Sequence, residues 1–242
     1  MNLIKLLTLS IFILLSSGCS LAYKVLLGVD TTPKWNTDKQ IVKQAKKYDI
    51  PDQYNLVLDT VTYAKDLKAI YKEAFQSLKI TNGDSNYYHN LKTARKDDQQ
   101  PTQFRLFDQS GKEIFKIVNC YVDAPPIEWN VEGCLDTFPP KTPFETLNIH
   151  QFDLDFLLAH SSYLNQTKLT FDALPKADYY GVIMWNEFMK RPSKRLVKTI
   201  RPYLDESEKS VILIYINSQN QLLWSAMDAK EKQKVKKLYG NK

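Results

Sequence analysis

The stretch Tyr180-Gly-Val-Ile-Met-Trp185 and the stretch Val211-Ile-Leu-Ile-Tyr-Ile216 decide the fold of this chain. Both are continuous apolar runs, which are typical of strands covered on both faces. Between them, Ser193 is placed to cap a helix. The apolar residues of that helix recur at helical spacing and are Leu196, Val197, Ile200 and Leu204. A strand, a helix and a strand in succession predict an α/β fold with a mixed sheet flanked by helices.

A β-hairpin is predicted between Pro101 and Val118. Two runs of alternating apolar residues, 101–107 and 113–118, flank five residues that contain Gly111, a pattern typical of a hairpin. We assign Phe104, Leu106, Ile114 and Lys116 to one face, and Phe107, Phe115 and Ile117 to the other. Apolar residues on both faces indicate a strand pair covered on each side.

Periodicity in the rest of the chain predicts helices over 38–48, 63–78, 151–160 and 228–240, and strands over 54–58 and 221–224. The stretch 81–100 is polar and turn-rich, so we expect an exposed excursion there. A strand, a helix and a hairpin would then occur in both halves of the chain, as a weak repeat of pattern.

A proline-rich connection is predicted over 121–146, because its five prolines suit neither a helix nor a ladder. Its aromatic residues Trp129, Phe138 and Phe144 indicate packing against the domain. The predicted organisation is a signal peptide (1–18), a lipidated N-terminus and tether (19–37), a first α/β half with the hairpin (38–120), the proline-rich connection (121–150) and a second α/β half (151–242).

The first twenty residues predict export. Lys5 gives a short positive region, an apolar run follows over 6–15, and Ser17 and Gly18 lead directly into Cys19. Such a run is too short for a membrane span, which needs ~20 apolar residues, and is typical of a secretory signal peptide. A cysteine at this point resembles the lipobox of bacterial lipoproteins, which implies cleavage before Cys19 and lipidation of its side chain.

Two other interpretations of this segment stay open, namely an ordinary secretory signal cut elsewhere and an uncleaved N-terminal anchor. The lipobox favours Leu three places before the cysteine, where this chain has Ser16. In bacterial lipoproteins, Asp directly after the lipidated cysteine is associated with retention in the inner membrane. This chain has Ser20 at that position. The resemblance therefore implies a cell-envelope protein held by lipid at the outer membrane and facing the periplasm.

Cys120 and Cys134 remain if Cys19 carries lipid. Exported proteins can form disulfides, and a bridge between these two would close a loop of about 14 residues and stabilise the fold by roughly 3 kcal/mol. Two free, buried thiols are the alternative. Neither cysteine belongs to a Cys-x-x-Cys pair, which weakens a catalytic role.

Two segments resemble the thioredoxin-like superfamily. The hairpin segment 101–117 resembles the part of that fold that holds its cis-proline and last two strands, and 180–185 with the following helix resembles the part that bears its Trp-Cys-x-x-Cys motif. Asn186 and Met189 stand at the two cysteine positions, and the segments occur in the reverse of the usual order. The resemblance implies a thioredoxin-like fold or a rearranged variant. The region 120–142 also resembles bacterial lipoproteins that have no assigned activity.

Composition and motifs exclude several classes of function. With 43% hydrophobic and 25% charged residues, the chain is neither disordered nor a repeat array. The net charge of +6 suits an anionic surface or acidic partner, while an exported protein seldom meets nucleic acid. His89, His150 and His160 lack metal-ligand spacing, and no phosphate loop or nucleophile elbow occurs. We predict no metal, cofactor or catalytic residue.

Basic residues gather around the helix that follows Trp185. They are Lys190, Arg191, Lys194, Arg195, Lys198 and Arg201. The candidate anion-binding surface consists of Trp185, Asn186, Arg191, Lys194 and Lys198. It would lie at the carboxyl end of a strand, where open α/β sheets bind ligands. The alternative is the solvated outer face of a packed helix.

Two functional hypotheses follow. The first is a membrane-anchored, redox-inactive binding or assembly module that contacts an unknown protein or anionic ligand through the turn after Trp185 and the proline-rich connection. The second is an envelope thiol-disulfide oxidoreductase or peroxidase-like enzyme that uses Cys120 or Cys134. A small-ligand carrier is a third, weaker possibility.

Overall fold

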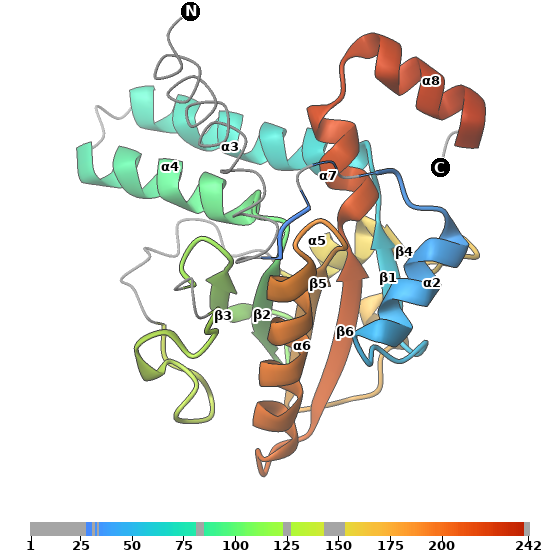
Figure 1. Cartoon of the computed structure of the whole chain (residues 1–242). Helices are drawn as coiled ribbons and strands as arrows, with labels where there is room; N and C mark the ends of the chain where they lie inside the picture. The colour runs from blue at the N-terminus through green and yellow to red at the C-terminus, as the bar shows by residue number, and fades with distance from the viewer. Residues whose placement is uncertain are drawn as a thin grey trace, which may run out of the picture.

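The computed structural model describes residues 28–30, 32, 34–80, 85–122, 127–142 and 153–239. The predicted signal peptide, the lipidation site Cys19, and the predicted residues Phe144 and His150 lie outside this part of the chain. Figure 1 shows a single sheet with helices on both faces.

The sheet has six strands in the order β3-β2-β5-β6-β1-β4. They are β1 (Asn55–Leu58), β2 (Gln103–Asp108), β3 (Glu113–Val118), β4 (Ser161–Ser162), β5 (Tyr179–Trp185) and β6 (Val211–Asn217). The central strands β5, β6 and β1 are parallel. At one side β2 pairs antiparallel with β5 and β3 antiparallel with β2, and at the other side β4 pairs antiparallel with β1. Both halves of the sequence contribute strands, and the predicted α/β fold with a mixed sheet is confirmed.

Seven helices are found in the described ranges: α2 (Asp38–Lys47), α3 (Thr62–Ile80), α4 (Ser85–Asp98), α5 (Leu154–Ala159), α6 (Lys190–Asp205), α7 (Gln219–Ala226) and α8 (Ala229–Tyr239). Two short 3₁₀ turns, η2 (Val131–Gly133) and η3 (Phe171–Ala173), lie in loops. The helices predicted over 38–48, 63–78, 151–160 and 228–240 are confirmed, apart from their end residues.

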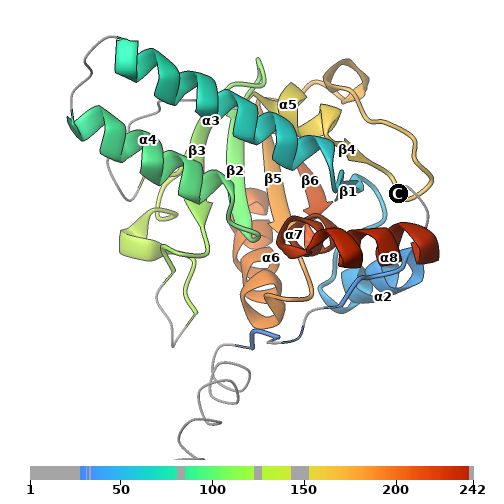
Figure 2. The same cartoon turned by 90° about the horizontal axis from the view of Figure 1, so that it is seen from above.

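The helices form a layer on each face of the sheet, as the view from above shows (Figure 2). On one face, α2, α6 and the proline-rich connection cover a core that includes Phe104, Ile183 and Trp185. On the other face, α3, α4 and α5 cover a second core around Leu56 and Val182. Burial of apolar side chains on both faces explains why β5 and β6 are continuous apolar runs.

The predicted packing of the proline-rich connection is confirmed for its described part. Trp129 is 1% exposed, and its indole Nε1 donates to the carbonyl of Pro192 at 3.1 Å. Phe138 contacts the rings of Tyr179 and Tyr203, with centroids 5.1 and 5.7 Å apart. This connection therefore belongs to the α6 side of the core.

The hairpin is confirmed, but the predicted faces of its second strand are wrong. Phe104 pairs with Ile117 and Leu106 with Phe115, and directly paired residues of antiparallel strands share a face. Phe115 and Ile117 therefore lie with Phe104 and Leu106, while Ile114 faces the other side. The register is set by the turn and by the irregularity between Leu106 and Phe107, and alternation within each strand reveals neither.

The predicted exposed excursion over 81–100 is also wrong, because α4 occupies most of it. Leu91, Asp97 and Asp98 of this helix are each at most 1% exposed. The inner face of this helix includes the two buried carboxylates of Asp97 and Asp98. In the sequence such a polar face cannot be distinguished from one that is exposed to solvent.

Two further predictions in the second half are corrected. Residues 221–224 lie in α7 and form no strand, so the predicted second hairpin and the repeat are absent from the described residues. Ser193 lies inside α6, which begins at Lys190 with Met189 as its cap residue. The side chain of Ser193 is buried and serves the preceding turn.

Candidate functional site at the carboxyl edge of the sheet

The three parallel strands end at one edge of the sheet, at Trp185 of β5, Asn217 of β6 and Leu58 of β1. In Figure 1 this edge lies at the top, beneath α7 and α8. Ligands of open α/β sheets bind outside the carboxyl ends of parallel strands. The edge is therefore the first place to examine for a site.

The side chain of Asn186, directly after β5, is the centre of a buried polar network. Its Nδ2 lies 2.9 Å from the carbonyl oxygen of Pro101, 3.0 Å from Thr102 Oγ1 and 3.3 Å from Ser218 Oγ. Its Oδ1 accepts from the amide of Met189 at 2.6 Å, and its own amide donates to Ser193 Oγ at 3.1 Å. We call Asn186, Thr102, Ser193 and Ser218 the Asn186 hub.

The hub joins the two segments that resemble the thioredoxin-like superfamily. Pro101 precedes β2, Asn186 follows β5, and these strands are direct neighbours in the sheet. One difference from the resemblance is that the bond before Pro101 is trans; the cis bond in the described residues precedes Pro139.

The N-terminal part of the described chain closes over the turn after β5. We call residues 28–30 and 34–37 the strap. The amide of Asp30 donates to the carbonyl of Phe188 at 2.8 Å, and the amide of Arg191 donates to the carbonyl of Gly28 at 3.3 Å. Gly28 has φ +64°, and a Cβ there would lie 2.5 Å from the Cβ of Arg191. A glycine permits this approach of the strap to α6.

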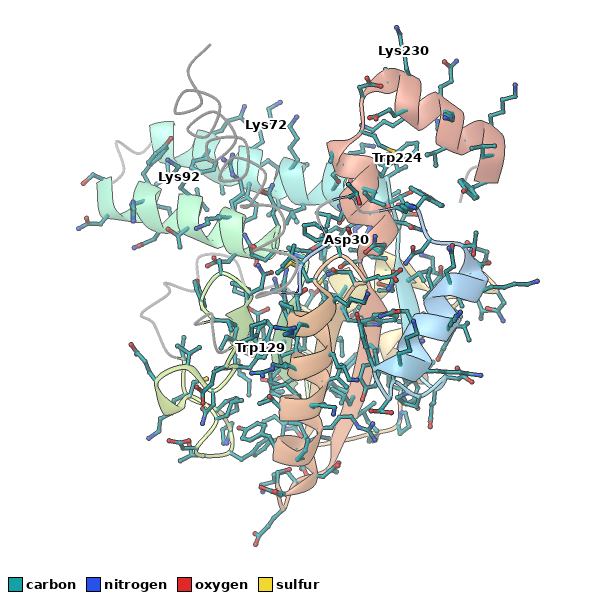
Figure 3. The ribbon with its side chains drawn as sticks, viewed as in Figure 1. Asp30, Lys72, Lys92, Trp129, Trp224 and Lys230 are labelled. Carbon is teal, nitrogen blue, oxygen red and sulfur yellow. The ribbon has the colours of Figure 1, made fainter. Side chains whose placement is uncertain are left out.

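Gln219 connects the strap to the same turn from the other side. Its Oε1 accepts from the amides of Glu187 and Phe188 at 3.1 and 2.9 Å, and its Nε2 donates to the carbonyl of Lys34 at 3.0 Å. Asn36 and Asn220 exchange two hydrogen bonds of 2.8 Å. Figure 3 shows Asp30 of the strap near the N-terminal end of α6.

Two members of the predicted anion-binding surface are therefore misplaced. Trp185 and Asn186 are both 0% exposed. The Trp185 ring packs edge-on against Tyr48 of α2, with centroids 5.7 Å apart. The continuous apolar run that makes β5 a central strand also buries its last residue, Trp185, and the hub buries the next residue, Asn186.

The basic members of that surface are exposed along α6. Arg191, Lys194 and Lys198 are exposed, as are Lys190 and Arg195. Arg195 Nη1 also donates to the carbonyl of Ile127 at 2.8 Å. The structure thus separates the predicted surface into a buried hub and an exposed basic face.

The two cysteines of the domain do not form the predicted disulfide in the structure. Cys120 is exposed and Cys134 is buried, and both are free thiols. Cys120 donates to Asp97 at 3.7 Å and Cys134 to the carbonyl of Trp129 at 3.7 Å. Partial burial and then Asp97 raise the pKa of Cys120, and burial raises the pKa of Cys134 to about 11. A raised pKa reduces the thiolate population that redox chemistry needs.

Sequence reasoning missed a buried cluster of charged side chains beneath α4. Arg105 on β2 is 0% exposed; its Nη2 lies 2.7 Å from Asp98 Oδ1, and its Nη1 bonds to Glu113. Lys116 Nζ lies 2.7 Å from the same Asp98 oxygen. We call Arg105, Asp98, Glu113 and Lys116 the charged cluster. An arginine between Phe104 and Leu106, in a strand predicted to be covered on both sides, was the signal that could have found it.

The charges of this cluster shift the pKa values of its carboxyls in opposite directions. Burial opposes ionisation of Asp98, but Arg105 and Lys116 outweigh it and lower the pKa of Asp98. For Glu113, burial outweighs the attraction of Arg105 and raises the pKa. The cluster holds the C-terminal end of α4 against the hairpin, because Asp98 of α4 pairs with Arg105 of β2 and Lys116 of β3.

No group of residues suited to a metal ion occurs among the described side chains. His160 is 8% exposed, and its Nδ1 lies 3.0 Å from Thr62 Oγ1. Burial lowers its pKa despite the nearby Asp66 and Asp59.

Across the described ranges, no helix has the length and apolarity that a membrane span requires.

No known family model, curated protein or solved structure matches this chain.

Proposed function

We propose that this chain is a lipid-anchored protein of the cell envelope whose thioredoxin-like domain has no redox centre and acts as a binding or assembly module. The observation that carries the proposal is the role of Asn186. It stands where the redox motif has its first cysteine, and it is fully buried and hydrogen-bonded to three elements. Met189, at the second position, is the cap residue of α6.

The thioredoxin-like part of the proposal is supported by the arrangement of the resembling segments. The hairpin β2–β3 lies beside β5, and the residue after β5 contacts the proline before β2. The order of these segments along the chain is reversed, so a rearranged variant of the fold accounts for the arrangement best.

The anchor, if it forms at Cys19, would orient the domain. Only residues 20–27 separate Cys19 from Gly28, so an extended tether reaches at most roughly 30 Å. Gly28 is bound to the first turn of α6. The anchor would therefore keep the exposed basic face of α6, which includes Lys194 and Lys198, near the membrane and near neighbouring envelope proteins.

The anchor is tested by replacing its cysteine. We expect the parent chain to incorporate labelled palmitate and to fractionate with membranes, because acyl chains contribute ~0.8 kcal/mol per buried CH₂. Cys19→Ser should abolish both, whereas Cys120→Ser should leave both unchanged. Equal membrane fractionation and labelling of the Cys19→Ser chain would contradict the anchor.

The contact surface is tested by crosslinking in native membranes. We expect Lys194→Glu with Lys198→Glu to lose a co-purifying partner that the parent chain retains. The matched control is Lys230→Glu with Lys234→Glu on α8, which is also exposed and basic and lies away from α6 (Figure 3). Equal loss in both double variants would contradict a role specific to α6.

A further inference from the structure

A pocket of about 410 Å³ opens at the carboxyl ends of β1 and β6, within the size range of small-molecule sites. It lies between the N-terminal turn of α2, the N-terminal turn of α7 and the last turn of α8. Its floor includes the apolar residues Ile41, Val57 and Leu58, and its rim includes the rings of Trp35 and Tyr239. The pocket is separate from the hub and from the exposed face of α6.

The pocket is lined by a buried side chain, that of Asn217, with an unpaired donor. Asn217 is 3% exposed, and its Oδ1 accepts from the amide of Gln219 at 3.2 Å. Its Nδ2 has no acceptor within the part of the chain that the structure describes. An unpaired buried donor costs about 1–3 kcal/mol, so this amide is suited to an acceptor oxygen brought by a ligand.

A second unpaired donor lies next to it. Trp185 pairs with Asn217 in the register of β5 and β6, and its indole Nε1 is buried without an acceptor among the described residues. Val57 follows in the same register on β1. Asn217 and Val57 line the pocket, while the Trp185 ring lies behind them against Tyr48. The inner end of the pocket therefore combines one unpaired donor with an apolar strand.

The acidic groups of the wall argue against an anionic ligand. Asp38 and Asp59 both line the pocket. Burial opposes ionisation of Asp59, but hydrogen bonds from Thr62 and Val61 outweigh it and lower its pKa. The wall thus keeps negative charge at neutral pH, and Lys39 is the cation among the lining residues.

The aromatic rim is fixed in place by its neighbours. Trp35 stacks on Tyr239 with ring centroids 5.9 Å apart and packs edge-on against Trp224 at 6.3 Å. Trp224 is labelled in Figure 3, beneath α8. A ring held in this way offers a flat apolar surface beside the polar wall.

We propose that this pocket binds a neutral saccharide. A sugar hydroxyl both accepts from a donor such as Asn217 Nδ2 and donates to a carboxylate such as Asp59, and the C–H face of a sugar ring packs on an aromatic side chain. The proposal gives the domain a ligand at a site that depends neither on Cys19 nor on the basic residues of α6.

The test is calorimetric titration of the full-length chain, purified from membranes in a detergent without a sugar headgroup. The probes are N,N′-diacetylchitobiose, cellobiose and, as an anion, inorganic phosphate. We expect saturable binding of at least one disaccharide and none of phosphate. Asn217→Leu and Trp35→Ala should each weaken binding at least tenfold, and Asn90→Leu on α4 should leave it unchanged.

Thermal melting of the ligand-free variants shows whether a loss of binding results from a loss of folding. Asn217→Leu removes the unpaired donor and also the acceptor of the Gln219 amide, so the ligand-free variant should melt a few degrees below the parent chain and still unfold cooperatively. Absence of disaccharide binding, binding of phosphate alone, or disaccharide binding that neither variant weakens would each overturn the proposal. Because Cys19→Ser leaves the pocket intact, failure here is distinct from failure of the lipid anchor.

Discussion

The charged cluster beneath α4 and the Asn186 hub are two buried polar networks that meet the same strand, β2, and they stabilise it by different means. The first pairs Arg105 with Asp98 and Glu113. The second joins Asn186 to Pro101, Thr102 and Ser218 through neutral groups alone. Burying charges is costly unless every charge is paired, whereas a neutral network costs less when one bond is lost.

Of the two networks, the Asn186 hub is the one that lies at the carboxyl edge of the sheet. The neutral network lies at the turn after β5, and the strap closes over this turn. The charged cluster lies beneath α4 and connects Asp98 of that helix to the hairpin. The four residues of the Asn186 hub are each at most 1% exposed.

The largest expected effect is loss of the central arginine. Arg105→Met should lower the free energy of unfolding by about 3–5 kcal/mol, because it leaves Glu113 without its ion-pair partner and Asp98 with Lys116 alone. Urea denaturation measures the change. Lys116→Met is the matched control, since the Lys116 side chain is 11% exposed and its loss should cost less. Equal losses in the two variants would contradict the central role of Arg105.

A smaller loss is expected at the neutral hub. Asn186→Ala should lower the free energy of unfolding by about 1–3 kcal/mol, because the amide of Met189 loses its acceptor and the carbonyl of Pro101 loses a donor. The same urea titration measures it, with the exposed Asn165→Ala as control. A change no larger than in the control would show that the hub is dispensable.

The smallest effect concerns pH. The lowered pKa of Asp98 means that its contribution is fully present above the unfolded pKa of about 3.9 and is lost as pH falls through the folded value. The stability gap between the parent chain and Asp98→Asn should therefore shrink below about pH 4. The gap for Asn186→Ala should stay constant. Titrations between pH 3 and 7 would contradict the account if the Asp98 gap stayed constant.

The sequence predicted the architecture where apolar periodicity was strong. The strands around Val182 and Ile214, the hairpin at Gly111 and the helix from Thr62 all followed from it. Apolar periodicity did not reveal α4, because the inner face of that helix is polar. It did not reveal α7 either, because the apolar run Leu222–Leu223 is too short to distinguish a helix from a strand. The pattern also gave the wrong hairpin faces, because the turn and the irregularity after Leu106 set the pairing of the two strands and a one-residue shift moves every side chain to the other face.

The candidate site was predicted only in part. The sequence located the edge through Trp185 and Asn186 and identified the exposed residues Arg191, Lys194 and Lys198. It could not show that the strap closes this turn, because the contacts join residues more than 150 positions apart, such as Asn36 and Asn220. Such pairings leave no local pattern, and the pocket beside Asn217 arises from them.

The most direct test of the central claim is thiol titration combined with an insulin-reduction assay on the purified mature chain. The account predicts two free thiols after denaturation, those of Cys120 and Cys134, and no turnover of insulin in the presence of dithiothreitol beyond the reductant alone. Turnover that Cys120→Ser or Cys134→Ser abolishes would contradict it.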